Sequence, residues 1–418
     1  MGIQNLSKIL KSNAPNAMIN RPLSSYMGYK VAIDTSIFLY KYMFVYGNVI
    51  DGLTRLIVAL LQNGILPVFI LDGKPPKEKS DLLKERKEKR EELIDIVHIL
   101  KYAYEQKDEN PQFEHYSKNE MKDNIKQYGE TYFTKRGYRE HLLSDDDWNM
   151  IYDVKPNSQE VFEKYIKETE RKIIRITKDH INDTIKLMEL FGIPCIIAQS
   201  EAESLCAVLC KKGIVDAVMS EDMDVLATGG CILLKNFTME KGGSVVEVCL
   251  EGVLKELELE FHSFLDMCIM CGCDYTSKIG GIGPTYAYKL MKKYGSIETA
   301  MPYIKNNKSY RVPNDFDYIT SRNLFNNACI NDDFEKYKSD VLHTIIKREE
   351  LLTFLNEKTK LKGKIFTEIN DLCKCYKNEK KMNQKVDEND PNDVSIILKN
   401  NPKLAYQPTL DNYFKKTK

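Results

Sequence analysis

The sequence predicts an α/β fold in which a mostly parallel central sheet carries helices on both faces. Two short apolar runs, residues 31–33 and 66–71, have the length and composition of buried strands. Between them, residues 51–62 carry apolar side chains at helical spacing, and Asn63-Gly64 is a typical helix stop. A strand, a helix and a second strand in this order form a parallel βαβ unit. The helix carries the chain back to the end of the sheet where the first strand began, so both strands run in the same direction.

The same alternation continues after residue 178 and extends the sheet. The pattern predicts two helices, residues 179–191 and 200–212, and four strands, residues 193–198, 215–219, 231–234 and 245–250. Strands that alternate with helices favour helices on both faces of one sheet.

The composition is that of an ordinary globular protein. The chain has 418 residues, of which 43% are hydrophobic and 29% are charged, which excludes wholesale disorder and fibrous structure. It has no apolar run near the ~20 residues that span a bilayer, and its opening residues lack the apolar core of a signal peptide. We therefore expect a soluble, intracellular protein that has no membrane contact and is a monomer.

The charges and cysteines exclude further classes. Lys plus Arg and Asp plus Glu both number 61, and this zero net charge argues mildly against a nucleic-acid binder, although local patches can still be basic. The 11 cysteines show no disulfide framework. Cys268, Cys271 and Cys273 lack a second cysteine or histidine pair at zinc-finger spacing, so we favour core packing over zinc.

The chain divides into five expected regions: residues 1–73 and 179–275 form the sheet, 74–178 an insertion, 276–375 a helix–hairpin–helix with C-terminal helices, and 376–418 a flexible tail. The insertion opens with a charged, helix-like stretch, Lys74–Glu92, and we expect Asp145–Asp147 to form a loop. Residues 378–401 are polar, and we expect them to be disordered.

Acidic residues follow the predicted strands or begin the predicted helices. They are Asp34, Asp72, Glu201, Glu203, Asp222, Asp224 and Asp274. Because the carboxyl ends of parallel strands meet at one edge, most of these acids should converge there. Seven carboxylates cannot lie together without cations, and oxygen-only ligands favour Mg²⁺ or Mn²⁺. Two such ions ~3.5–4 Å apart suit phosphodiester hydrolysis.

Taken singly, each acid also has a structural explanation. Residues 200–203, Ser-Glu-Ala-Glu, match a capping box, and Asp34 can be a plain helix N-cap. Asp222 and Asp224 can be loop acids. The ordered set at successive strand ends favours the metal site. A Ca²⁺-binding module does not fit, because the acids are not spaced as one loop.

Six short segments contain these acids or a glycine turn: Ile33-Asp34-Thr35-Ser36, Asp72-Gly73-Lys74-Pro75-Pro76, Ser200-Glu201-Ala202-Glu203, Glu221-Asp222-Met223-Asp224, Gly272-Cys273-Asp274-Tyr275 and Gly281-Ile282-Gly283-Pro284. With the opening Met1-Gly2-Ile3-Gln4, they closely resemble the flap endonuclease/XPG family of structure-specific 5′ nucleases. The similarity runs in order from residue 1 to about 330 and more weakly to about 375.

The resemblance implies a PIN-like nuclease fold with an inserted helical arch and a helix–two-turn–helix DNA-binding element. In the family, Asp34, Asp72, Glu201 and Glu203 would hold the first metal, and Asp222, Asp224 and Asp274 would complete the second side. The products would carry a 3′-hydroxyl and a 5′-phosphate.

The resemblance also implies residues that contact DNA: Gly2, Tyr40, Lys79, Arg86, Gly281 and Gly283. Lys79 and Arg86 align with a catalytic basic pair that steers the scissile phosphate, although a solvated, salt-bridged helix also explains this charged stretch. Tyr40 aligns with an aromatic that stacks on the terminal base pair, and an ordinary helix aromatic is an equal alternative. The Gly281–Pro284 turn would bind duplex phosphates and K⁺.

Two departures from the family concern the substrate. The segment between Asp34 and Asp72 is shorter than in typical flap endonucleases. In the family this segment contains the wedge that splits the duplex and the pocket for a 3′ flap. The insertion after Asp72 is long, which affects threading of the 5′ strand.

The tail has a pattern typical of a sliding-clamp ligand. Gln407, Leu410, Tyr413 and Phe414 fit the PIP box, Gln-x-x-aliphatic-x-x-aromatic-aromatic, within residues 407–414. One helical turn would place the three apolar side chains on one face. A frayed terminus with a few apolar residues is the alternative.

The sequence therefore predicts a Mg²⁺-dependent 5′ flap endonuclease and 5′–3′ exonuclease that acts on branched DNA in replication and repair. Cleavage of bubbles or Holliday junctions is the nearest alternative, and a catalytically silent scaffold that binds DNA and the clamp is the other. We expect it in the nucleus or at another site of DNA replication, which for a viral protein is the host nucleus or a cytoplasmic replication site.

Overall fold

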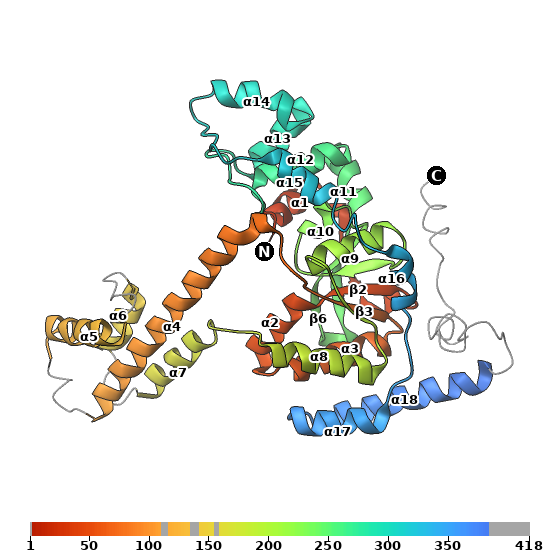
Figure 1. The fold of residues 1–418 in the computed structure, drawn as a ribbon, viewed down its shortest axis with the longest axis horizontal. Helices are drawn as coiled ribbons and strands as arrows, with labels where there is room; N and C mark the ends of the chain where they lie inside the picture. Colours follow the sequence, from red (N-terminus) through yellow and green to blue (C-terminus); the bar gives the residue numbers. More distant parts are fainter. Residues whose placement is uncertain (1, 110–115, 134–141, 154–158, 384–418) are drawn as a thin grey trace. The chain divides into compact units, whose positions relative to one another are not determined.

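The chain folds into two compact units (Figure 1). The computed structural model describes residues 2–109, 116–133, 142–153 and 159–383. The first unit contains residues 1–79 and 176–418, and the second contains Ser80–Arg175. The second unit lies inside the predicted insertion, residues 74–178.

The first unit is built on a seven-stranded sheet in the order β1-β7-β6-β5-β2-β3-β4. The strands are β1 (Met18–Pro22), β2 (Lys30–Asp34), β3 (Leu66–Leu71), β4 (Cys195–Ile197), β5 (Ala217–Met219), β6 (Ile232–Thr238) and β7 (Ser244–Cys249). The five strands from β6 to β4 pair in parallel, whereas β7 pairs antiparallel with both β6 and β1. The predicted, mostly parallel sheet is confirmed.

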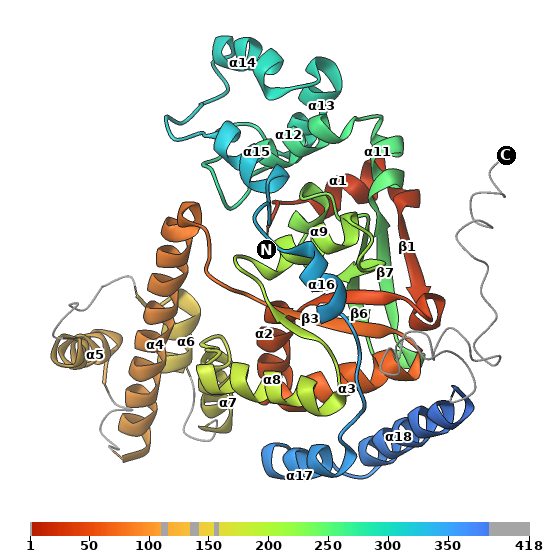
Figure 2. The same ribbon diagram turned by 45° about the vertical axis from the view of Figure 1, so that its right-hand side comes forward.

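Strand β1 is an edge strand that the sequence pattern did not predict. Its residues, Met-Ile-Asn-Arg-Pro, are half-buried or exposed, so they lack an apolar stripe. The strand forms because it pairs along its whole length with β7, and Arg21 adds an ion pair of 3.2 Å to Glu247. Figure 2 shows β1 and β7 side by side. Pairing of this kind depends on tertiary context more than on local composition.

Each face of the sheet packs against its own layer of helices. Along β2, Ala32 belongs to one apolar core while Val31 and Ile33 belong to the other, as the two-residue period of a strand requires. The first core contains residues of α1 (Leu6–Asn13), α9 (Ala202–Lys211), α10 (Asp224–Ala227), α11 (Leu250–Leu257), α12 (Phe261–Cys271) and α13 (Pro284–Tyr294). The second contains residues of α2 (Thr35–Tyr46), α3 (Val49–Gln62), α8 (Lys178–Phe191), α17 (Arg348–Lys358) and α18 (Lys364–Asn383).

The expected glycine turn lies before α13. Gly281 has a left-handed φ of +85°, and a Cβ atom there would overlap the carbonyl oxygen of Ser309. Gly283 is the N-cap residue of α13, and Pro284 is its first residue. Beyond this helix the chain forms α14 (Ile297–Asn306), α15 (Tyr318–Asn326) and α16 (Phe334–Asp340).

In its described residues, the second unit contains four helices with a core of their own. They are α4 (Ser80–Glu109), α5 (Lys118–Tyr132), α6 (Asp145–Asp153) and α7 (Gln159–Glu170). Ile99, Ile125, Ile151 and Phe162, one from each helix, meet in this core.

Two local predictions were wrong. Asp145–Asp147 begins α6 and is not a loop. The Ser144 hydroxyl accepts the Asp147 N–H at 3.2 Å, the Asp147 carboxylate accepts the Ser144 N–H at 2.8 Å, and acids are favourable in a first helical turn. At the other end of the chain, α18 continues to Asn383, so residues 378–383 are helical; residues 384–401 lie outside the described part.

No single helix in the described ranges is long and apolar enough to cross a membrane; α2 and α3, bent by 115° at their break, pass that test only as a pair. Cys268 and Cys271 are buried in α12, which confirms their packing role.

Candidate metal centre at the carboxyl edge of the sheet

The acids lie where the parallel strands end. Asp34 is the last residue of β2, Asp72 follows β3, and Asp222 follows β5. Because β5, β2 and β3 are adjacent and parallel, their carboxyl ends meet at one edge. The sheet therefore brings together acids that are far apart in the sequence.

Asp34 is held at this edge by a serine that the sequence analysis missed. The Ser220 hydroxyl donates to Asp34 Oδ2 at 2.7 Å, and its oxygen accepts the Asp222 N–H at 2.9 Å. Both Asp34 and Ser220 are buried. Burial, with repulsion from the Asp72 and Asp222 carboxylates, raises the pKa of Asp34 to about 7, although the Ser220 hydrogen bond opposes this rise. The signal available in the sequence was that Ser220 is a polar residue directly after an apolar strand.

Glu201 and Glu203 lie at the start of α9, and they do not form the capping box. Glu201, not Ser200, is the N-cap residue, and it makes no capping hydrogen bond through its side chain. The Asp72 carboxylate instead accepts the Ala202 N–H at 2.8 Å, which joins β3 to this helix. Burial and repulsion from Glu201 raise the pKa of Glu203 well above its ordinary value. A structural role as a helix cap therefore does not explain Glu203.

Asp222 and Asp224 are buried and are not loop acids in solvent. Asp222 Oδ1 accepts the Asp224 N–H at 3.0 Å, and Asp224 Oδ1 accepts the Ile3 N–H at 2.8 Å. Asp224 Oδ2 is buried without a hydrogen-bond partner. Burial, with repulsion from Asp222 and Asp274, raises the pKa of Asp224 well above its ordinary value. An unpartnered buried carboxylate oxygen is the kind of atom that a cation satisfies.

The N-terminal backbone passes directly against these two acids. Gly2 has a φ of +71°, and a Cβ atom at this position would overlap the Oδ1 atoms of both Asp222 and Asp224. Only glycine fits here, for conformational and steric reasons together. Gly2, which the resemblance predicts to contact DNA, therefore lies beside Asp222 and Asp224.

Lys79 is the cation of the cluster. It is 7% exposed, and its ammonium forms ion pairs with Glu201, with Glu203 at 3.5 Å and with Asp274 at 3.3 Å. Burial opposes its charge, but the glutamates outweigh burial and raise its pKa. The expectation of a solvated helix residue is wrong for Lys79, because it precedes α4 in a short helical turn, Lys77–Lys79.

Tyr275 is a second residue that the sequence analysis missed in this role. Its hydroxyl donates to Glu201 Oε2 at 2.6 Å, and its ring lies 5.3 Å from the Lys79 ammonium. Burial and the neighbouring glutamates raise its pKa, so it remains a hydrogen-bond donor. The side chain of Tyr275 thus fixes both Glu201 and Lys79.

The donor set fits a hard divalent cation. Its candidate ligands are carboxylate oxygens, one of which lacks a hydrogen-bond partner, and the pKa values of Asp34, Glu203 and Asp224 are raised by burial and by repulsion between carboxylates. Among the described residues, no three acidic, histidine or cysteine side chains form a ready-made metal cage. Lys79 instead provides the positive charge for Glu201, Glu203 and Asp274.

Two further predicted residues lie on helices. Arg86 is exposed on α4 in the second unit, and Tyr40 is 43% exposed on α2. The tail residues Gln407, Leu410, Tyr413 and Phe414 lie outside the described residues.

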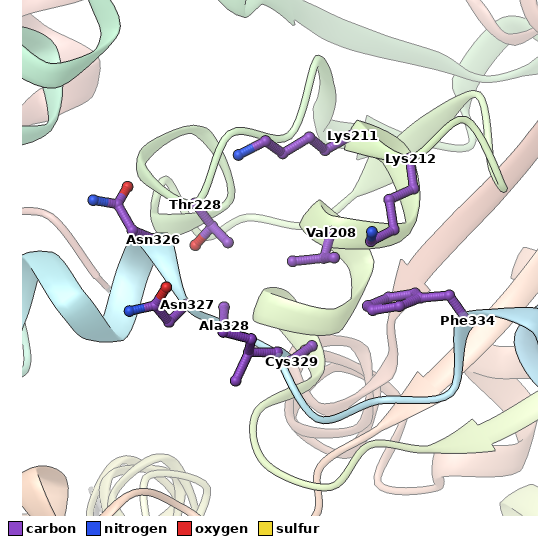
Figure 3. Close-up of a pocket in the computed structure, with 10 residues that line it drawn as sticks. Val208, Lys211, Lys212, Thr228, Asn326, Asn327, Ala328, Cys329 and Phe334 are labelled. Atoms are coloured by element: carbon purple, nitrogen blue, oxygen red, sulfur yellow. The ribbon is translucent and has the colours of Figure 1, made fainter.

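A cavity of about 390 Å³ lies at the opposite end of α9 (Figure 3). It is lined by Lys211 and Lys212 of α9, by Thr228, and by Asn326 and Phe334. The Lys212 ammonium lies 4.3 Å from the centre of the Phe334 ring. None of the seven acids lines this cavity, so the hollow and the carboxylate cluster are separate features.

Comparison with known proteins decides the family. A model of the XPG N-terminal domain matches residues 1–93, and one of the XPG I-region matches residues 192–274. Flap endonuclease 1-A of Sorghum bicolor is 33% identical over 372 residues, which are 85% of this chain and 82% of that protein. Flap endonuclease 1 of Cryptosporidium parvum is 30% identical over 413 residues, 91% and 71% of the two chains. The chain belongs to the XPG/flap endonuclease family.

The family segments contain the whole carboxylate cluster. Asp34, Asp72 and Lys79 lie in the XPG N-terminal match, and the remaining five acids lie in the I-region match, which ends at Asp274. The resemblance inferred from short motifs is thereby confirmed, and the chain is a nuclease of the XPG/flap endonuclease family.

Solved structures confirm the fold. The catalytic core of Rad2 in complex with a DNA substrate has a TM-score of 0.61 at 21% identity, covering 89% of this chain and 100% of that chain. Flap endonuclease-1 from Methanococcus jannaschii has a TM-score of 0.51 at 20% identity, covering 87% and 97%. These likenesses confirm the predicted nuclease fold of the XPG/flap endonuclease family.

Proposed function

We propose that the chain is a divalent-metal-dependent 5′ flap endonuclease and 5′–3′ exonuclease that acts on branched DNA. One observation carries the proposal: carboxylates from successive strand ends form a buried, mutually repelling cluster that includes a lysine ion-paired to three of them. Folding alone does not favour such an arrangement, because burying charge is unfavourable. Flap endonuclease relatives that align over most of the chain support the same activity.

The seven acids would hold two Mg²⁺ ions, and Mn²⁺ would substitute. Asp34, Asp72, Glu201 and Glu203 would bind one ion, and Asp222, Asp224 and Asp274 would complete the other side. When bound, such ions lower the pKa of the attacking water and stabilise the leaving oxygen of the phosphodiester.

Lys79 would act at the scissile phosphate. Its ammonium already lies among the carboxylates, and Tyr275 holds Glu201 beside it. A cation at this position stabilises negative charge that develops on the phosphate oxygens. Arg86 would contribute a second cation from α4, as the family alignment implies.

The DNA duplex would be held away from the reacting phosphate. The Gly281–Pro284 turn offers backbone N–H groups to phosphates without sequence preference, and its carbonyls are the proposed K⁺ ligands. Tyr40, exposed on α2, would stack on the terminal base pair.

The decisive experiment is cleavage of a substrate panel in Mg²⁺. The panel contains 5′-labelled single-flap, double-flap, bubble and four-way junction DNA. We expect the 5′ flaps to be cleaved fastest, leaving a 5′-phosphate and a 3′-hydroxyl. Preferred cleavage of bubbles or junctions would instead support a different specificity, and DNA binding without cleavage would indicate a silent scaffold.

The tail would bind the replication sliding clamp, which places the protein in the nucleus or at another site of DNA replication. Replacing Tyr413 and Phe414 by alanine should abolish stimulation of cleavage by the clamp, because the hydrophobic plug is lost. Basal cleavage of a naked flap should be unchanged and is the control. A full clamp response in the double variant would place the contact elsewhere.

A further inference from the structure

Two cysteines lie on neighbouring segments of the first unit, outside the carboxylate cluster. Cys210 is buried near the end of α9, and Cys231 is exposed on the loop that precedes β6. The two thiols are close enough for each to shift the pKa of the other. The Cys210 thiol donates to the Asp216 carbonyl oxygen at 3.7 Å, and the Cys231 thiol donates to the Gly229 carbonyl oxygen at 3.9 Å.

Close backbone packing keeps the two segments together. A Cβ atom on Gly230 would lie 3.4 Å from the Cα atom of Ala207, and one on Gly229 would lie 3.3 Å from the Lys211 side chain. The loop therefore rests directly on the last turns of α9. A disulfide needs two cysteines whose backbones are already near each other, and this packing provides that condition.

The surroundings make Cys231 the reactive partner. The neighbouring Cys210 side chain and the Lys211 ammonium lower the pKa of Cys231, whereas the Cys231 side chain and burial raise the pKa of Cys210. An exposed thiolate beside a cation is the nucleophile in thiol oxidation, and a neighbouring thiol can then resolve the product.

We propose that Cys231 and Cys210 form a redox-active pair that hydrogen peroxide converts into an intrachain disulfide. The Cys231 thiolate attacks one peroxide oxygen, the O–O bond breaks, and hydroxide leaves, so that Cys231 becomes a sulfenic acid. The Cys210 sulfur then attacks the Cys231 sulfur and loses its proton, an S–S bond forms, the S–O bond breaks, and water leaves. Both sulfur atoms are oxidised and both peroxide oxygens are reduced to water.

The disulfide would join two elements that carry predicted metal ligands. Glu201 and Glu203 lie at the start of helix α9. The loop that contains Cys231 follows α10, which begins at Asp224. The modification is defined by its own chemistry, so its detection does not depend on nuclease activity.

The test is disulfide mapping by mass spectrometry on the full-length protein. Reduced protein is treated with hydrogen peroxide, remaining thiols are blocked with N-ethylmaleimide, and tryptic peptides are compared before and after dithiothreitol. We expect a peroxide-dependent link between residues 210 and 231 that dithiothreitol reverses. Fragment spectra distinguish Cys210 from Cys195 and Cys206 on the same peptide.

Two variants sharpen the result. Cys231→Ser, at an exposed site, should abolish the link without affecting folding. Cys249→Ser is the matched control, because Cys249 pairs with Ile232 on the adjacent strand, and it should leave the link intact. Lys211→Gln should slow alkylation of Cys231 by iodoacetamide by about threefold or more, because the thiolate loses its cation.

Three results would overturn the proposal. They are a Cys231 that remains fully alkylatable after peroxide, a Cys231 recovered only as sulfinic or sulfonic acid, and a disulfide that forms with Cys249 and is lost in Cys249→Ser.

Discussion

The two ends of helix α9 carry opposite charges in different surroundings. Glu201 and Glu203 lie at its N-terminal end, and Lys211 and Lys212 lie at its C-terminal end. The helix dipole favours both arrangements, so charge alone distinguishes neither end as a functional site. The difference lies in burial: Glu201 is buried and ion-paired to Lys79, whereas the two lysines are exposed.

This difference shows that the candidate metal site of this protein is distinguished by buried charge more than by the presence of a cavity. The cavity beside the lysines holds about 390 Å³, but its charged groups remain in solvent and require no compensation. Glu203 at the other end, and Asp224 in the same cluster, have raised pKa values because they are desolvated and repelled by neighbouring carboxylates. Perturbed carboxyl groups in a cluster are typical of functional sites.

The largest expected effect comes from removing one charge at the acidic end. Asp222→Asn keeps the side-chain oxygen that accepts the Asp224 N–H, so the fold should persist. Cleavage of a 5′ flap should fall by ~10³-fold or more, because one proposed ligand of the two-ion site is weakened. Single-turnover kinetics in Mg²⁺ measure this.

Glu221→Gln is the matched control for Asp222→Asn. Glu221 is the adjacent acid, but its carboxylate accepts the Asn236 N–H at 3.0 Å outside the cluster. The cleavage rate of Glu221→Gln should stay within about threefold of the wild-type rate. Equal losses in both variants would remove the distinction between buried and peripheral acids.

The next effect separates the two roles of Lys79. Lys79→Met should lower the single-turnover rate by ~10²-fold, because a cation at the phosphate is lost. It should also tighten Mn²⁺ binding, measured by calorimetry without DNA, because the ammonium no longer competes for Glu201 and Glu203. Arg86→Met, on α4, should lower the rate but leave Mn²⁺ affinity unchanged. Weaker Mn²⁺ binding in Lys79→Met would contradict the competition.

A smaller effect concerns stability without metal. The pKa of Asp34 rises from 3.8 to about 7 in the fold, so its neutral form is favoured there. The contribution of protonated Asp34 to the free energy of unfolding is therefore fully present below about pH 3.8, and it is lost as the pH rises through about 7. At pH 8 and without metal, the free energy of unfolding of Asp34→Asn should exceed that of the wild type by on the order of 2 kcal/mol.

Thermal unfolding in EDTA across this pH range measures the effect of Asp34→Asn. The Tm gain should shrink toward pH 4, and Mg²⁺ should raise the Tm of the wild type more than that of the variant. A Tm difference that does not change with pH would exclude titration of Asp34 as its cause.

The smallest effect is expected at the other end of α9. Lys212→Gln removes a cation that lies over the Phe334 ring at an exposed site. Stability should change by less than about 1 kcal/mol, and flap cleavage should be unchanged. A cleavage defect comparable to that of Lys79→Met would show that the cavity also takes part in catalysis.

The sequence was sufficient to predict the parallel strands and the acids that follow them, because both depend on local pattern. Residues 31–33 and 66–71 are apolar without interruption, and β2 and β3 form there. Since strand order then determines which carboxyl ends meet, Asp34, Asp72 and Asp222 could be placed at one edge before their contacts were known.

The contacts that organise the cluster could not be predicted from local pattern. Lys79 looks like one of many lysines in a charged stretch, and its burial depends on Glu201, Glu203 and Asp274, which are distant in the sequence. Ser220 and Tyr275 donate hydrogen bonds to acids on other elements for the same reason. Strand β1 exists only because β7 offers an unpaired edge.

The separate core of the second unit has an evolutionary consequence. Ile99, Ile125, Ile151 and Phe162 pack with one another and belong to neither core of the sheet. The chain passes between the two units only near residues 79–80 and 175–176. Insertions, deletions and exchanges between these junctions can therefore accumulate without repacking the sheet. The second unit can therefore vary in length and sequence while the strands that carry the acids keep their register.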